Sequence, residues 1–267
     1  MEKELLEAYH RIFTGKGNEP DWAVHKAAPG REAELVHCPI PFVGKEYASQ
    51  KTRILVYASA ENLSRYNGYL DDDGFAINRH RRYFDASAPD RFFPNVHIQP
   101  FSNGYLPIIA FYVYLKYQDA ARLTPAAFSE RIAFANYGKY TIQPDAGENR
   151  NQDYAGSRRK LGQSHEYVRQ DLGILRPDVI IMPASIYKAD RAFVDENKGN
   201  AAILPIYQIL PRTIASRKMI RRYAPADPGK LHPAVLDWYR HLKDGRTKDN
   251  FLSVFTYLDA VMEEAGL

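Results

Sequence analysis

The chain has 267 residues, of which 45% are hydrophobic and 25% are charged, the balance of an ordinary globular protein with room for a sizeable core. The net charge of +4 permits nucleic-acid binding without requiring it, so the placement of the basic residues matters more than their number. A single cysteine, Cys38, excludes a disulfide framework and a cluster held by several cysteines.

Nothing in the sequence predicts a membrane partner. No apolar run comes near the roughly 18 residues that a membrane-spanning helix needs. The opening stretch, "MEKELLEAYHRIF", carries three glutamates and lacks the apolar segment of a secretory signal. We therefore expect a cytoplasmic protein.

The expected elements alternate between helices and strands. Residues 2–13 predict an amphipathic helix, whereas residues 14–50, rich in glycine and proline, predict an irregular segment. Apolar runs typical of strands buried on both faces lie at 54–58, at 132–141 with a break at Asn136, at 176–185 and at 200–210. Helices are predicted at 105–123, 124–132, 163–175, from a Ser185 cap onward, at about 213–223, at 232–243 and at 249–265.

This alternation predicts an α/β layer fold with a mostly parallel sheet. Ligands of such sheets bind beyond the carboxyl ends of the strands, so the residues that directly follow each strand are the first candidates for a site. For the segment that follows the third strand, "PASIYKADRAF", a helix capped by Ser185 explains the pattern without special chemistry.

The first strand ends in a polar turn that contains Ser59, Glu61 and Asn62. A carboxylate and an amide here are able to position a water molecule or a hydroxyl group. The alternative is structural, with Ser59 capping a helix and Glu61 interacting with the dipole of its first turn.

The second strand ends in an amide followed by a lysine. Asn136 offers a donor and an acceptor together, which suits the edge of a nucleobase, although a local turn bond is the alternative. We expect Lys139 near the mouth of the site, either on a phosphate or in solvent.

The last strand leads directly into a basic stretch. Gln208 and Pro211 lie at its end, and five basic residues follow, Arg212, Arg217, Lys218, Arg221 and Arg222. The last four share one face of a predicted helix. No acidic residue lies between Leu210 and Ala226, which favours an anionic partner over a solvated face.

Several kinds of site have no motif in the sequence. The eight histidines lack the spacing of zinc ligands, so no metal site is predicted. The glycine-rich dinucleotide motif, the Walker A loop and the nucleophile elbow are also missing, so no cofactor is expected.

Taken together, the strand ends resemble the uracil-DNA glycosylase superfamily. The segments that carry the resemblance are "ILVYASAEN", "IAFANYGKYT", "LRPDVIIMPAS" and "ILPIYQILPRTI", and the likeness covers roughly residues 40–223. It implies a three-layer α/β/α fold with a central, mostly parallel four-stranded sheet, here as a single domain over residues 1–267 with helical N- and C-terminal extensions. It also implies a metal-independent enzyme that flips a damaged base out of double- or single-stranded DNA and cleaves its N-glycosidic bond.

The resemblance also implies roles for individual residues. Asn136 matches the amide that reads the base, and Glu61 or Asn62 falls in the turn that positions water. Phe75 or Tyr66 is assigned as the aromatic that stacks on the base, with Lys139 nearby. The remaining assignments lie where the family has its His-Pro loop and in the basic helix beyond it. Roles in catalysis or in DNA binding are assigned there to Gln208, Pro211, Arg212, Arg217, Lys218 and Arg221.

The sequence departs from the family in two motifs. The first lacks its glycine and proline, and the last lacks its histidine. Three hypotheses follow, namely a DNA glycosylase-like enzyme acting on a deaminated base such as uracil, a catalytically impaired glycosylase-fold protein that binds nucleic acid, and an unrelated α/β enzyme on a small anionic nucleoside or sugar phosphate. Apart from Asn62, Tyr66 and Phe75, the segment 62–104 has no assigned role, and a lid or a surface insertion are the two alternatives for it.

Overall fold

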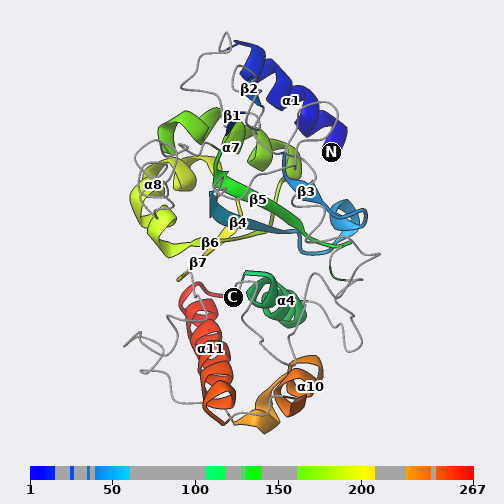
Figure 1. The fold of residues 1–267 in the computed structure, drawn as a ribbon, viewed down its shortest axis with the longest axis vertical. Helices are drawn as coiled ribbons and strands as arrows, with labels where there is room; N and C mark the ends of the chain where they lie inside the picture. The colour runs from blue at the N-terminus through cyan, green and yellow to red at the C-terminus, as the bar shows by residue number, and fades with distance from the viewer. Residues whose placement is uncertain are drawn as a thin grey trace.

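The computed structural model describes residues 1–15, 25–26, 35–36, 40–60, 106–117, 128, 130–139, 161–207, 227–241 and 245–267. Its centre is a five-stranded sheet in the order β3-β5-β4-β6-β7 (Figure 1). The four parallel strands are β4 (Ile54–Ala60), β5 (Ala133–Gly138), β6 (Val179–Pro183) and β7 (Ala202–Ile206). The α/β class predicted from the sequence is therefore confirmed.

The sheet has one strand more than the four expected. β3 (Phe42–Val43) pairs antiparallel with β5 at the edge of the sheet, within the segment expected to be irregular. A separate two-stranded pair, β1 (His25–Lys26) and β2 (Leu35–Val36), lies in the same segment. Strands of two residues are too short to show a hydrophobic period, so the sequence carried no signal for them.

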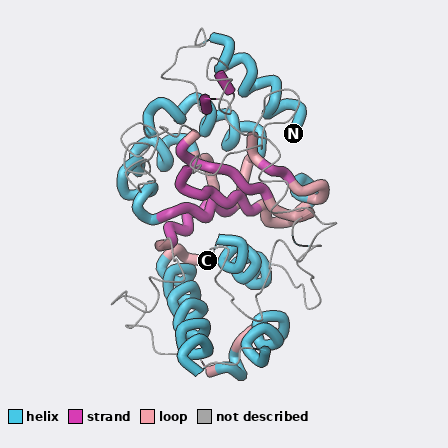
Figure 2. The backbone as a smooth tube through the Cα atoms, in the orientation of Figure 1, coloured by secondary structure: helices cyan, strands magenta, loops and turns pink. Residues whose placement is uncertain are grey.

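Helices cover both faces of the sheet (Figure 2). One face packs against α7 (Leu161–Leu175) and α8 (Ala184–Asn197), and α1 (Glu2–Gly15) lies against α7. The other face packs against α4 (Leu106–Tyr117) and α11 (Gly245–Glu264), and residues of α10 (Pro233–His241) extend that core. Two short 3-10 turns, η2 (Tyr47–Ser49) and η5 (Pro228–Lys230), complete the described elements.

The strand period of two divides the core between these faces. In β4, Ile54 and Val56 face α4 and α11, whereas Leu55 and Tyr57 face α1, α7 and α8. All four side chains are buried, and burial of each aliphatic one contributes about 1.5–3 kcal/mol. β4 therefore needs apolar side chains on both faces, which is why the sequence shows it as a continuous run.

Two local predictions need correction. β5 does not break at Asn136, because its pairing with β4 continues through Ala58↔Asn136 and Ala60↔Gly138. Ser185 does not cap α8, since the helix begins at Ala184 directly after Pro183. The segment 213–223 and most of 124–132, where helices were expected, lie outside the described residues.

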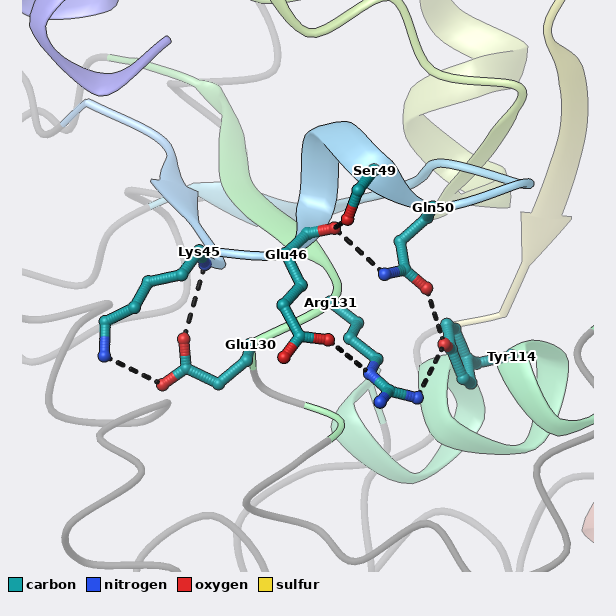
Figure 3. Close-up of polar contacts among 7 residues, drawn as sticks. All are labelled: Lys45, Glu46, Ser49, Gln50, Tyr114, Glu130 and Arg131. Atoms are coloured by element: carbon teal, nitrogen blue, oxygen red, sulfur yellow. Dashed lines mark hydrogen bonds and ion pairs between the residues drawn. The ribbon is translucent and has the colours of Figure 1, made fainter.

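A polar network closes the sheet where β5 begins (Figure 3). Lys45 pairs with Glu130 at 3.5 Å, and Arg131 pairs with Glu46 at 2.9 Å. A hydrogen bond from the Tyr114 hydroxyl to Oε1 of Gln50 (2.7 Å) links this network to α4. At this amino edge the charges satisfy one another, which indicates a structural role.

Arg53 and Asp178 join β4 to β6 at the same edge. Asp178 Oδ2 accepts from the Arg53 backbone N–H (2.8 Å) and from its Nε (3.1 Å), while Oδ1 accepts from a terminal nitrogen (3.2 Å). The Arg53 guanidinium holds the pKa of the Asp178 carboxyl below its ordinary value of 3.8. The pair is partly open to solvent, so its contribution to stability is modest.

This pair gives the stability of the protein an acid-dependent component. Because the pKa is lower in the folded chain, the Asp178 carboxylate stabilises the fold above its unfolded pKa, and this stabilisation is lost as the pH falls through the folded pKa. We expect Asp178→Asn to lower the free energy of unfolding by about 1 kcal/mol or less at pH 6. Urea unfolding of both proteins from pH 7 to pH 2 should show this difference vanishing in acid, and a constant difference would contradict the prediction.

Candidate functional site at the carboxyl edge of the sheet

The four parallel strands end along one edge of the sheet, at Ala60, Gly138, Pro183 and Ile206. Asn136 lies near the end of β5 beside Ala58 of β4, and Gly138 pairs with Ala60 in the same register. This edge is where ligands of parallel sheets bind. β4 therefore brings small residues beside Asn136.

Asn136 is the predicted site residue that the structure places at this edge as expected. It is only 5% exposed, and the strand period puts it on the face that also carries Phe134, toward α4 and α11. An amide buried to this extent is costly unless its polar atoms have partners. It is therefore unusual for a central strand and remains the leading candidate for recognising a polar ligand.

Lys139 is not at the mouth of a site. Its side chain has no exposed surface, and its Nζ lies 2.7 Å from Oδ2 of Asp171, whose side chain is also fully buried. Its backbone N–H donates to Oγ of Ser164 (2.9 Å), which ties the end of β5 to α7. Both expectations for Lys139, a phosphate contact and a solvated side chain, are corrected, because the ammonium is already paired inside the protein.

Asp171 collects three hydrogen bonds from three different elements. The Tyr9 hydroxyl of α1 donates to Oδ1 (2.6 Å), while the Tyr57 hydroxyl of β4 (3.1 Å) and Lys139 donate to Oδ2. Burial raises the pKa of the Asp171 carboxyl, and the Lys139 ammonium and the two hydroxyls oppose that rise. Burial and the neighbouring carboxylate also raise the pKa of Tyr57. Because solvent does not reach this network, we assign it to the structure rather than to chemistry.

A second polar cluster lies partly open at the same edge. Nε2 of His165 in α7 lies 2.8 Å from Oδ2 of Asp190 in α8, and the Tyr137 hydroxyl of β5 donates to the same oxygen (2.7 Å). The His165 ring stacks on Phe193 with 3.5 Å between ring centroids and 7° between planes. The His165 and Asp190 side chains are 24% and 13% exposed.

Sequence reasoning missed this cluster. His165 and Asp190 are separated by β6, and no spacing rule links residues on two helices that pack side by side only in the folded chain. Asp190 also has non-helical backbone angles inside α8 (φ −129°, ψ 27°), a kink that apolar periodicity does not reveal. The side chain of Tyr137 points toward α7 and α8 because β5 continues past Asn136, where the sequence had predicted a break.

The other predicted site residues lie outside the described part of the chain. They are Glu61, Asn62, Tyr66, Phe75, Gln208, Pro211, Arg212, Arg217, Lys218 and Arg221. The structure therefore neither groups nor separates them.

The described residues show neither a metal site nor a membrane-spanning helix, and the sequence matches no family model and no curated protein. Within the described ranges, no three side chains of His, Cys, Asp or Glu come together in a way that suits a metal ion. No described helix is both long and apolar enough to cross a membrane.

The buried network predicts a large effect from a small substitution. Asp171→Asn keeps the shape of the side chain but leaves the Lys139 ammonium buried without a counter-charge, so we expect a loss of about 3–5 kcal/mol in the free energy of unfolding. Glu7→Gln, which removes the carboxylate of the exposed Lys3–Glu7 pair, is the control and should cost at most about 1 kcal/mol. Urea denaturation measures both. Equal losses for the two variants would contradict the structural role of Asp171.

Proposed function

We propose that the protein is a DNA glycosylase-like enzyme that flips a deaminated base such as uracil out of DNA and hydrolyses its N-glycosidic bond. The observation that carries the proposal is Asn136, a buried amide at the carboxyl end of a parallel strand, beside small residues of the neighbouring strand. An amide supplies the donor and the acceptor that the edge of a nucleobase requires.

The architecture supports the same proposal. The resemblance to the uracil-DNA glycosylase superfamily implies parallel strands between helices, with the base-reading amide after the second of them. β4, β5, β6 and β7 are four such strands, and Asn136 lies near the end of the second. The proposed enzyme works in the cytoplasm and needs no metal or cofactor.

The charge distribution supports DNA as the partner. β7 ends at the same edge as β5, and the chain continues from there into the basic stretch Arg212–Arg222. Tyr207, the first residue after β7, is 43% exposed, and an exposed tyrosine is able to stack on a base. We propose that the basic stretch contacts the phosphate backbone while the base approaches Asn136.

A binding protein without catalysis is the second candidate. The histidine of the family's last motif is absent, and Lys139 is committed to Asp171 and so cannot hold a phosphate in this conformation. Loss of one well-aimed donor typically lowers an enzymatic rate by about 10²–10³-fold. The two candidates differ in whether a base is released, and the third hypothesis, an enzyme on a small nucleoside or sugar phosphate, predicts no salt-dependent DNA affinity.

The test is a strand-cleavage assay. Oligonucleotides that each carry one uracil, hypoxanthine or xanthine are incubated with the protein and then treated with alkali, and binding to them is measured in parallel. We expect release of one base, and we expect Asn136→Ala to lower that release by about 10–100-fold, the equivalent of one lost buried hydrogen bond. Gln50→Ala, which removes an amide at the opposite edge of the sheet, should leave release unaltered.

Each result has a distinct meaning. Release that is insensitive to Asn136→Ala would remove Asn136 from base recognition. Tight binding without release would favour the binding protein over the enzyme. If the protein neither released a base nor bound DNA in a salt-sensitive way, both the enzyme and the binding protein would be refuted.

The basic stretch predicts a specific salt dependence. The double change Arg217→Ala and Arg221→Ala should weaken DNA binding equally for all sequences and reduce the slope of log affinity against log salt by about 2, because each phosphate contact contributes about 0.9. The matched control is Lys3→Ala with Lys51→Ala, two exposed lysines outside the basic stretch. Filter binding between 50 and 200 mM salt measures both, and identical slopes for the two double variants would place the DNA elsewhere.

A further inference from the structure

The His165 cluster differs from the other buried polar cluster in its access to solvent. Lys139 and Asp171 have no exposed side-chain surface, whereas His165 and Asp190 retain 24% and 13%. Both clusters are built on α7, but only His165 is within reach of a ligand. This difference separates a structural pair from one that is able to exchange protons.

The partner of His165 determines which nitrogen carries its proton. A carboxylate only accepts hydrogen bonds, so Nε2 of His165 must donate to Oδ2 of Asp190. The neutral ring then has its lone pair on Nδ1. Among the described residues no polar partner of Nδ1 occurs, and Nδ1 is the nitrogen whose lone pair is able to accept a proton.

The ring is also held in place from two sides. Phe193 stacks on one of its faces, and Asp190 fixes the edge that carries Nε2. Tyr137 anchors the same carboxylate oxygen to β5, so the position of the ring is tied to the sheet. The guanidinium of Arg169, one turn further along α7, lies 5.1 Å from the Phe193 ring centroid and has no ion-pair partner among the described residues. A base held in this way is preorganised for proton transfer.

We propose that His165 is the general base of the reaction and that Asp190 is its positioning residue. This inference rests on the glycosylase activity proposed above. Nδ1 takes a proton from a water molecule while the water oxygen forms a bond to C1′ of the nucleotide. The C1′–N bond breaks with its electron pair on the base, which then receives the proton, so that one water is consumed and a free base is released.

The topology places His165 and Asn136 near the same edge of the sheet, on opposite faces. Asn136 and Tyr137 are consecutive, so they point to opposite faces of β5, one toward the amide site and the other toward Asp190. Both α7 and α8 begin at the carboxyl edge, and α8 follows β6 directly. In the proposed reaction the nucleotide binds beyond the strand ends, at the edge that the two groups approach from opposite faces of the sheet.

The deciding variant is His165→Gln. Its side-chain amide is able to donate to Asp190 as Nε2 does, but it lacks the basic nitrogen, so the hydrogen bond is kept and the proton acceptor is lost. We expect base release to fall by about 10²–10⁴-fold, with unchanged DNA affinity and unchanged thermal stability. His10→Gln, the same substitution at an exposed position of α1, is the control and should change none of the three.

An NMR measurement tests the same proposal without any substrate. The ring ¹⁵N signals of His165 should report the proton on Nε2 in the unaltered protein, and Asp190→Asn should relax that preference and lower kcat while KM stays the same. A proton found on Nδ1 instead would overturn the proposal.

The outcomes separate this inference from the proposed function. Release by the unaltered protein that persists in His165→Gln would overturn the role of His165 and leave the glycosylase standing. Loss of release together with loss of DNA affinity or stability would make His165 structural. Absence of release from every oligonucleotide by the unaltered protein would refute the glycosylase and the role of His165 with it.

Discussion

The fold depends on one buried ion pair, Lys139–Asp171, at the place where β5 meets α7. Two charges in a dry interior gain attraction but lose hydration, so such a pair adds little net free energy. The pair instead favours one packing arrangement over others, because neither charge is tolerated there without the other. α1 and β4 supply the remaining hydrogen bonds through Tyr9 and Tyr57, so the arrangement in which all these groups are satisfied is the one in which α1, α7, β4 and β5 are docked together.

The polar pairs at the carboxyl edge of the sheet are more buried than those at the amino edge. At the amino edge Arg131 pairs with Glu46, and Arg53 pairs with Asp178, so the charges there have partners from the protein itself. At the carboxyl edge Asn136 is held on one face and His165 is partly open on the other. The asymmetry follows from parallel topology, because connections to helices leave all strand ends on one side, where side chains from several segments converge.

Prediction from sequence succeeded where one physical signal dominates. β4 and β6 are apolar on both faces, and that alone identifies central parallel strands such as "ILVYA" and "VIIMP". It failed for β3, whose two residues carry no period, and for Ser185, since Pro183 ends β6 and α8 follows without a polar cap. Asn136 was recognisable because an amide interrupts an apolar run, but the pairing of His165 with Asp190 exists only after α7 and α8 have packed.

The end of β5 connects these observations in four residues. Asn136 faces α4 and α11, Tyr137 faces Asp190, and Lys139 reaches Asp171. Burial and the Asp190 carboxylate raise the pKa of Tyr137, which favours the protonated hydroxyl that donates to Asp190. This hydrogen bond ties Asp190 to β5, and the same carboxylate oxygen accepts from His165 and orients its ring. β5 thus sets the positions of both proposed groups, the general base His165 and the amide of Asn136 that reads the nucleobase. The Lys139–Asp171 ion pair, two residues after Tyr137, fixes the end of the strand itself.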